Sequence, residues 1–182
     1  MKFNKIALSG AFLIEPQRFG DERGWFAESW SQSAFAEAGI DCEWAQDNHS
    51  FSAPKHTLRG LHYQTPPHAQ DKLVRCTRGR IWDVAVDFRK SSPTFLRHVG
   101  VGLTAENGHQ LLVPAGFLHG FVTLEENCEV QYKCSERYAP ECDAGIRWDD
   151  PDIAIDWPFA DSPILSDKDS AAPFVADVRS PF

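Results

Sequence analysis

Short hydrophobic runs follow one another along the chain, separated by polar or turn-forming residues. Runs of this length are typical of β-strands and are too short for most helices. Residues 82–87, WDVAVD, alternate along the run and predict a half-buried strand. Many short strands at regular spacing predict an all-β sandwich, jelly roll or barrel. The expected strands span residues 10–16, 24–30, 42–51, 57–64, 72–77, 80–88, 96–103, 109–114, 120–125 and 128–135.

The breaks between these runs contain residues that favour turns. The strongest signal is Asn107-Gly108, because an Asn-Gly pair is typical of a tight β-hairpin. Further breaks lie at Thr65-Pro66-Pro67, Arg78-Gly79 and Ser92-Pro93.

Two segments favour a short helix. Residues 31–39, SQSAFAEAG, begin with a serine cap, place apolar residues at helical spacing and stop at Gly39. Residues 166–173, SDKDSAAP, predict a helix near the C-terminus that packs on the β core. The N-terminal apolar run is broken by Ser9-Gly10 and lacks a small-residue cleavage site, so it favours a first strand over a signal peptide.

Length and charge narrow the class of protein. At 182 residues the chain is expected to form one domain, residues 1–182. The net charge of −8 offers no basic surface to nucleic acid or an anionic membrane, so an anionic substrate would need a local cluster of Arg and Lys. The five cysteines form no C-x-x-C pair, so we expect free thiols in a reducing cytoplasm. No apolar stretch approaches the roughly 18 residues that span a bilayer.

Two histidines lie in strand-like surroundings and suggest a particular scaffold. His62 lies in LRGLHYQ and His119 in PAGFLHG, and together these segments are similar to the two sequence motifs of cupins, small jelly-roll barrels that often hold a metal. A metal-binding cupin needs a second histidine two places after the first and a glutamate soon after. Position 64 is Gln64, so the sequence predicts a cupin-like barrel without a metal site.

A broader resemblance covers nearly the whole chain. The sequence resembles the dTDP-4-dehydrorhamnose 3,5-epimerases of deoxysugar-nucleotide biosynthesis. The resemblance implies an all-β, cupin-like jelly roll with a few short helices, no metal, no cofactor and a homodimer. It also implies inversion of C3 and C5 in dTDP-4-dehydro-6-deoxy-D-glucose to give dTDP-4-dehydro-L-rhamnose. The matching stretches are FGDERGWFAES (19–29), QDNHS (46–50), LRGLHYQ (58–64), DKLVRC (71–76), VAVDFRKSSPTF (84–95), VPAGFLHGFVTL (113–124), YKCSERYAP (132–140) and LSDKDSAAP (165–173).

The resemblance also implies roles for individual residues. His62 would be the base, Asp169 its partner, Tyr132 the proton donor, and Lys72 the group beside the C4 oxygen. Tyr138 would stack on the thymine. Glutamate is common in the family where this chain has Asp143, which puts one polar contact in doubt. The positions that would hold the sugar and the diphosphate are Arg23, Glu28, Gln46, Asn48, Arg59, His119, Asp143 and Lys168.

These residue types suit the chemistry. A proton beside a ketone is acidic because the resulting carbanion spreads onto the carbonyl oxygen, and a histidine near neutral pH can remove it. A carboxylate would orient that histidine, a lysine would stabilise the enolate oxygen, and an acid on the opposite face would complete the inversion. In a regular strand Arg59 and His62 would point to opposite faces. The strand must therefore bulge or bend, and we expect this at Gly60.

Two alternatives stay open. A sister enzyme would epimerise only C3 or C5, or would act on a sugar carried by another nucleotide. A sugar-nucleotide-binding barrel without catalysis would keep the arginines and could lose the His62, Asp169 and Tyr132 set. Taken alone, each of these residues has an ordinary structural explanation: a satisfied core histidine, a helix cap and a core tyrosine. Trp25 and Phe26 are expected in the core or at a dimer interface.

Overall fold

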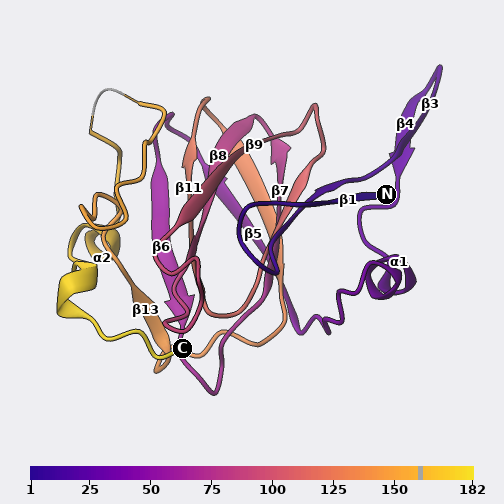
Figure 1. The fold of residues 1–182 in the computed structure, drawn as a ribbon. Coiled ribbons are helices and arrows are strands. Elements are labelled where there is room, and N and C mark those ends of the chain that lie inside the picture. Colours follow the sequence, from indigo (N-terminus) through magenta and orange to yellow (C-terminus); the bar gives the residue numbers. More distant parts are fainter. Residues whose placement is uncertain (160–161) are drawn as a thin grey trace.

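The computed structural model describes residues 1–159 and 162–182, and it confirms the predicted all-β jelly roll. Two antiparallel sheets face each other across the core (Figure 1). The six-stranded sheet contains, in spatial order, β1 (Lys2–Lys5), β2 (Phe12–Glu15), β10 (Gln110–Val113), β7 (Lys72–Arg78), β12 (Cys128–Cys134) and β5 (Gln46–Ser52). The five-stranded sheet contains β13 (Asp143–Gly145), β6 (Leu58–Gln64), β11 (Phe117–Thr123), β8 (Arg80–Asp87) and β9 (His98–Thr104).

The five-stranded sheet is covered on both faces. On its inner face Ile81, Ala85 and Phe117 join the core that fills the space between the sheets. On its outer face Val84 packs in a second core cluster with Trp157, Val175 and other residues from the C-terminal part of the chain. Strand β8 is therefore buried along almost its whole length, and the prediction of a half-buried strand over residues 82–87 is wrong. The sequence pattern of one strand carries no signal for a distant tail that covers its second face.

The Asn107-Gly108 turn does not form a hairpin. It connects β9 to β10, and these strands belong to different sheets. The Asn107 side chain instead closes the turn by accepting hydrogen bonds from the backbone N–H groups of Thr104 and His109. The left-handed backbone at Gly108 (φ +62°) suits the turn, but the strands on either side find partners elsewhere.

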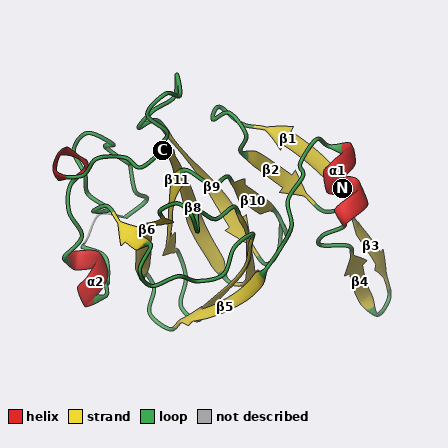
Figure 2. Cartoon of the chain, turned by 90° about the horizontal axis from the view of Figure 1, so that it is seen from below, coloured by secondary structure: helices red, strands yellow, loops and turns green. Residues whose placement is uncertain are grey.

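A hairpin and a helix project from the barrel on the side of β1 (Figures 1 and 2). The predicted strand over residues 24–30 is shorter than expected: β4 (Gly24–Ala27) pairs with β3 (Arg18–Asp21) as a separate two-stranded ribbon. Helix α1 (Gln32–Glu37) follows, with Ser31 at the N-cap position but without the predicted side-chain capping bond. Trp25 and Phe26 are 60% and 70% exposed, so a core position within this chain is ruled out.

The C-terminal segment wraps the five-stranded sheet. Helix α2 (Asp167–Ser170) is shorter than the predicted segment and contacts β6, and the 3-10 helix η1 (Val175–Asp177) follows it. All five cysteines are free. In the part of the chain that the structure describes, no helix has the length and apolar character needed to cross a membrane.

Candidate active site

Two adjoining cavities open between the sheets where β6, β7, β12 and α2 meet. One has a volume of about 190 Å³ and the other about 220 Å³, and both are lined by His62, Lys72, Tyr132 and Lys168. The first cavity adds Arg59, His119 and Asp169. The second adds Gln46, Asn48, Tyr138 and Asp143. The structure thus brings together all the residues singled out from the sequence except Arg23 and Glu28.

Strand register explains why residues distant in sequence meet here. Cys134 of β12 lies opposite Gln46 of β5 and Lys72 of β7, and Tyr132 lies opposite Asn48. Side chains two positions apart on a strand share a face. Lys72, Tyr132, Gln46 and Asn48 therefore lie on one face of the six-stranded sheet, and this face is turned toward β6.

The irregularity expected in β6 lies at Gly60. Pairing of β6 with β11 shifts register between the His119–His62 and Phe121–Arg59 pairs, and Gly60 has a left-handed φ of +126°. The Gly60–Leu61 peptide bond is cis. Because of the register shift, Arg59 and His62, three residues apart, line the same cavity. A Cβ atom at position 60 would lie 2.6 Å from the Cα of Gly120, so only glycine fits.

His62 is paired with Asp169. The distance from His62 Nε2 to Asp169 Oδ1 is 2.5 Å, and Asp169 is only 5% exposed. Burial alone would raise the pKa of Asp169, but the hydrogen bond and charge of His62, with a bond from Ser166, hold it below its usual value. Asp169 is therefore a carboxylate at neutral pH. Its bond to Nε2 orients the ring and leaves Nδ1 as the nitrogen that can accept a proton from a bound molecule.

Tyr132 lines the same cavity from the opposite sheet. Burial and the neighbouring Cys134 raise the pKa of Tyr132, and this outweighs the lowering by Arg59 and Asn48. The phenol therefore keeps its proton at neutral pH and can act as an acid. His62 and Tyr132 place a base and an acid on opposite sides of one cavity.

Lys72 begins β7 and lies at the floor of both cavities. Burial lowers the pKa of Lys72, and the field of Lys168 lowers it further. Cys134, Asp143 and Asp83 act in the opposite direction. A lysine held in this way is a strong donor to a developing oxyanion in a site with little water.

Tyr138, Asp143 and Lys168 meet at the mouth of the second cavity. The Tyr138 hydroxyl donates to Asp143 Oδ2 at 2.9 Å, and the Lys168 ammonium donates to the same oxygen. Tyr138 is 52% exposed, which leaves its ring free to stack on a planar group. The Asp143 carboxylate therefore joins the β12–β13 loop to α2.

Gln64 stands where a metal-binding cupin has its second histidine, and its side chain bonds to the backbone of neighbouring loops. Its Nε2 donates to the carbonyl oxygens of His68 and Arg137, and its Oε1 accepts from the backbone N–H of Ala139. Among the described residues, no three His, Cys, Asp or Glu side chains are arranged to hold a metal ion. The donor set that this cavity offers is one for acid–base chemistry.

Arg23 and Glu28 lie outside both cavities. Arg23 is in the turn of the β3–β4 hairpin, where its guanidinium pairs with Asp21 at 2.5 Å. The cavities also include residues that the sequence did not single out. Ser50 and Phe121 follow Asn48 and His119 by two strand positions, so the period-two rule could have found them. Asp83 was also missed, and its buried carboxylate lies 2.8 Å from His119.

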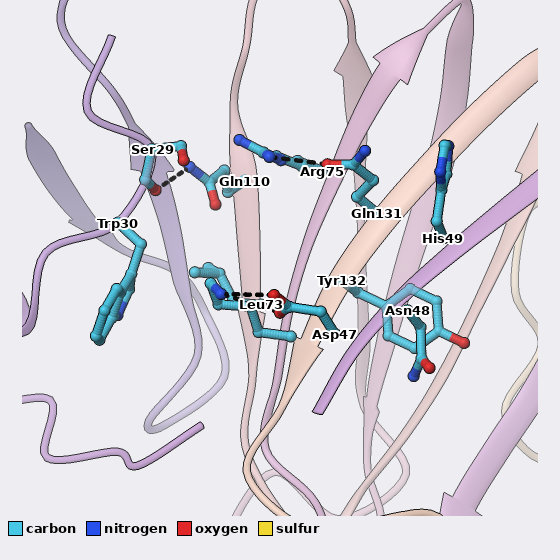
Figure 3. Close-up of a pocket in the computed structure, with 11 residues that line it drawn as sticks. Ser29, Trp30, Asp47, Asn48, His49, Leu73, Arg75, Gln110, Gln131 and Tyr132 are labelled. Carbon is cyan, nitrogen blue, oxygen red and sulfur yellow. Dashed lines mark hydrogen bonds and ion pairs between the residues drawn. The ribbon is translucent and has the colours of Figure 1, made fainter. Parts of the chain in front are cut away.

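A separate hollow of about 250 Å³ opens on the side of the six-stranded sheet that faces Ser29 and Trp30 (Figure 3). In it Arg75 donates to Gln131, and Gln110 donates to the carbonyl oxygen of Ser29. The side chains of Tyr132 and Asn48 point away from this group. The Tyr132 ring therefore belongs to the cavity that it shares with His62.

The fold and the cavity define a class: a cupin-like jelly roll whose cavity is lined by a histidine–carboxylate pair and by a tyrosine from the facing sheet. A family model described as dTDP-4-dehydrorhamnose 3,5-epimerase matches residues 5–177. The chain belongs to this family.

Individual relatives agree with this assignment. The dTDP-4-dehydrorhamnose 3,5-epimerase of Salmonella typhimurium is 52% identical over 172 residues, covering 94% of this chain and 93% of the relative. A crystal structure of dTDP-6-deoxy-D-glucose-3,5-epimerase from Legionella pneumophila in complex with dTDP-4-keto-L-rhamnose is 42% identical, with a TM-score of 0.94, and covers 98% of this chain and 94% of that one. A 3'-monoepimerase from Streptomyces bikiniensis in complex with dTDP-quinovose is 37% identical, with a TM-score of 0.89, and covers 95% of this chain and 87% of that one.

Proposed function

We propose that this protein inverts C3 and C5 of dTDP-4-dehydro-6-deoxy-D-glucose to give dTDP-4-dehydro-L-rhamnose, through enolate intermediates and without a cofactor. The observation that carries the proposal is the position of the His62–Asp169 pair and of Tyr132 on opposite sides of one cavity. Family membership makes the chain an isomerase-class enzyme. The substrate and the residue roles are drawn from this geometry together with the relatives.

The same set of groups serves both carbons. His62 accepts the proton from C5 or C3, and the electron pair of the broken C–H bond forms the enolate with the C4 oxygen. The Lys72 ammonium stabilises that oxygen while it carries negative charge. Tyr132 then delivers a proton to the same carbon from the opposite face, and the ketone re-forms. Solvent removes the proton from His62 and restores the one on Tyr132, so the net change is inversion.

The remaining cavity residues suit a nucleotide-linked sugar. Arg59, His119 and Lys168 supply positive charge or N–H donors for the diphosphate, against the overall negative charge of the chain. The exposed ring of Tyr138 lies at the mouth and would stack on the base. Gln46 and Asn48 would bond to sugar hydroxyl groups.

Proton exchange with solvent tests the proposal. In D2O, the wild-type protein and the 4-keto substrate should yield deuterium at both C3 and C5, together with product of inverted configuration. Incorporation at only one carbon would identify a mono-epimerase, which the similarity to the Streptomyces bikiniensis enzyme makes the second candidate. Binding of dTDP without any exchange would identify a non-catalytic barrel and overturn the proposal.

A homodimer would account for the two residues that lie outside the cavities. The β3–β4 hairpin carries Arg23 away from the barrel and exposes Phe19, Trp25 and Phe26 to solvent. Exposed aromatic groups on a projecting ribbon favour burial against another protein surface. We propose that this surface belongs to a second copy, so that Arg23 and Glu28 reach the partner's cavity. The free thiols favour a reducing compartment, and we propose the cytoplasm.

A further inference from the structure

Asp83 is a fully buried acid in contact with the cavity residue His119, and the proposed mechanism leaves its role unexplained. It lies in the middle of β8, is 0% exposed, and points to the inner face of the sheet between Ile81 and Ala85 of the apolar core. Its Oδ1 lies 2.8 Å from His119 Nε2. Within the described chain, its Oδ2 is buried and has no hydrogen-bond partner.

Such a carboxylate lowers the stability of the folded state. Burial of an ionised group with an unsatisfied oxygen costs several kcal/mol unless nearby positive charge compensates for it. An apolar residue of similar size would satisfy this core position better. The presence of an acid at this core position therefore indicates a function in the adjacent cavity.

The acid faces two groups that line the cavity. His119 belongs to β11, and its bond to Asp83 through Nε2 leaves Nδ1 as the ring nitrogen for a ligand in the cavity. Lys72, on the facing sheet, lines the same cavity as His119, which contacts Asp83, and the charge of Asp83 raises the pKa of Lys72 against the effect of burial.

We propose that Asp83 is a positioning residue: it fixes the His119 ring with Nε2–H toward the core and serves as the buried counter-charge of the Lys72 ammonium. This inference rests on the proposed function, because both groups are assigned to the substrate there. Asp83 itself does not line the cavity and has no role in proton transfer. The two histidines that line this cavity, His62 and His119, are thus each paired with a carboxylate, one for the base and one for a substrate-binding ring.

Other groups around Lys72 bear on any pH dependence and must stay unchanged in the test. They are Tyr132 and Cys134 on β12, Arg59 and His62 on β6, His119 on β11, Asp143 on β13, and Lys168 and Asp169 on α2. Because all of them are present in wild type and in Asp83 variants alike, a difference between these proteins reports on position 83.

Asp83→Asn separates charge from hydrogen bonding, because an amide oxygen can still accept from His119 Nε2. Without the negative charge, the pKa of Lys72 falls further, so its ammonium is lost at a lower pH. The alkaline limb of the kcat profile should move to lower pH, and each pH unit of this shift should lower kcat on the limb by about tenfold. Asp83→Val, which removes the bond as well, should also raise KM about tenfold, because the His119 ring is no longer held.

Asp87→Asn is the matched control. Asp87 is a fully buried acid of the same strand, but it bonds to Arg89, Ser92 and Thr94 and does not line either cavity. We expect a lower melting temperature in this variant with the kcat profile and KM of wild type. Equal effects of Asp83→Asn and Asp87→Asn, confined to melting temperature, would overturn the inference and leave Asp83 a structural residue.

A measurement without turnover covers the case in which the Asp83 variants fail to fold. In wild type labelled with 15N-histidine, NMR should show His119 with its proton on Nε2, and a ring with the proton on Nδ1 alone would overturn the inference. Because this spectrum needs no substrate, its outcome is independent of the proposed epimerase activity. Absence of deuterium exchange in the wild-type protein would contradict only the proposed epimerase function, and the NMR spectrum would still decide the inference about Asp83.

Discussion

At the scale of single residues, the proposed inversion depends on the position of His62 and Tyr132 on opposite sheets. A base acting alone removes a proton and returns it to the same face, so the configuration is kept. The Asp169 carboxylate fixes the ring of His62, and burial keeps Tyr132 protonated. In the proposed reaction the two residues therefore make separable contributions: one to breaking the C–H bond and one to the stereochemical outcome.

Two substitutions should separate these contributions. His62→Ala should remove deuterium incorporation at both carbons and lower kcat by about 10³-fold or more, because a general base is lost. Tyr132→Phe should keep incorporation into the substrate while product of inverted configuration falls by a similar factor. NMR of the sugar in D2O measures both quantities. His98→Ala, an exposed histidine of β9, is the control and should behave as wild type. Retained exchange in His62→Ala would exclude His62 as the base.

Lys72 should set a pH limit on catalysis. In the proposed reaction the ammonium form stabilises the enolate, and burial holds the pKa of Lys72 below its usual value of 10.5. The enzyme should therefore lose activity as pH rises through a value below 10.5, earlier than an ordinary lysine would cause. Lys72→Met should abolish this limb and lower kcat by about 10²- to 10³-fold at neutral pH. The exposed Lys55→Met should leave the whole profile unchanged. An alkaline limb that persists in Lys72→Met would assign it to another group.

At the scale of elements, the shape of strand β6 determines whether His62 and Arg59 both reach the cavity. The register shift at Gly60 turns Arg59 and His62 to the same side, and the next residues return to ordinary pairing with β13. Gly120 on the neighbouring strand allows the close approach, since the backbones meet where neither residue carries a side chain. The active site thus depends on backbone shape as much as on the functional groups.

Gly60→Ala should damage both the fold and the site. The left-handed backbone and the 2.6 Å contact to Gly120 force β6 to move, at a cost of about 3 kcal/mol in the free energy of unfolding. Activity should fall by at least about tenfold even where the protein remains folded, because a small displacement of His62 misaligns the base. Denaturant unfolding and kcat give the two measurements. Gly102→Ala on β9, where a Cβ meets nothing within 4 Å, should be nearly neutral in both, and equal effects in the two variants would contradict this account.

The success of sequence-based prediction also differs between elements. Motifs such as residues 58–64 and 165–173 predicted the cavity residues, because each functional side chain lies in a short local pattern. Local patterns gave wrong predictions where a segment distant in sequence determines how a strand is buried or paired. The tail buries the outer face of β8, and the turn at Asn107-Gly108 serves strands that pair elsewhere. Asp83 was missed for the same reason. Its contact with His119 on the neighbouring strand cannot be read from the apolar run that contains it.

At the scale of the whole molecule, one chain does not bring all the expected substrate-binding residues to one cavity. The β3–β4 hairpin projects from the barrel, and α2, which carries Asp169, packs against β6 on the other side (Figure 2). A closed two-fold dimer would let each hairpin serve the neighbouring barrel, since such an interface contributes the same residues twice. Each active site would then contain His62 from one copy and Arg23 from the other.

Mixed dimers test this arrangement directly. Arg23→Ala and His62→Ala should each be impaired as pure proteins, the first mainly in KM and the second in kcat. When the two chains are co-expressed with different tags and the mixed dimer is purified, one of its two sites combines an intact cavity with an intact hairpin. We therefore expect about half of the wild-type activity per dimer, which the D2O assay measures. Light scattering should give the mass of two chains.

A matched pair shows whether recovery depends on hairpin exchange. His62→Ala and Lys72→Met both lie in the cavity of a single chain, so each site of their mixed dimer keeps one defect and should stay inactive. We expect activity to recover in the mixed dimer of Arg23→Ala and His62→Ala but not in that of His62→Ala and Lys72→Met. This result would show that the hairpin acts on the partner's cavity. If neither pair recovers activity, Arg23 acts within its own chain, and the hairpin must fold back to the barrel when substrate binds.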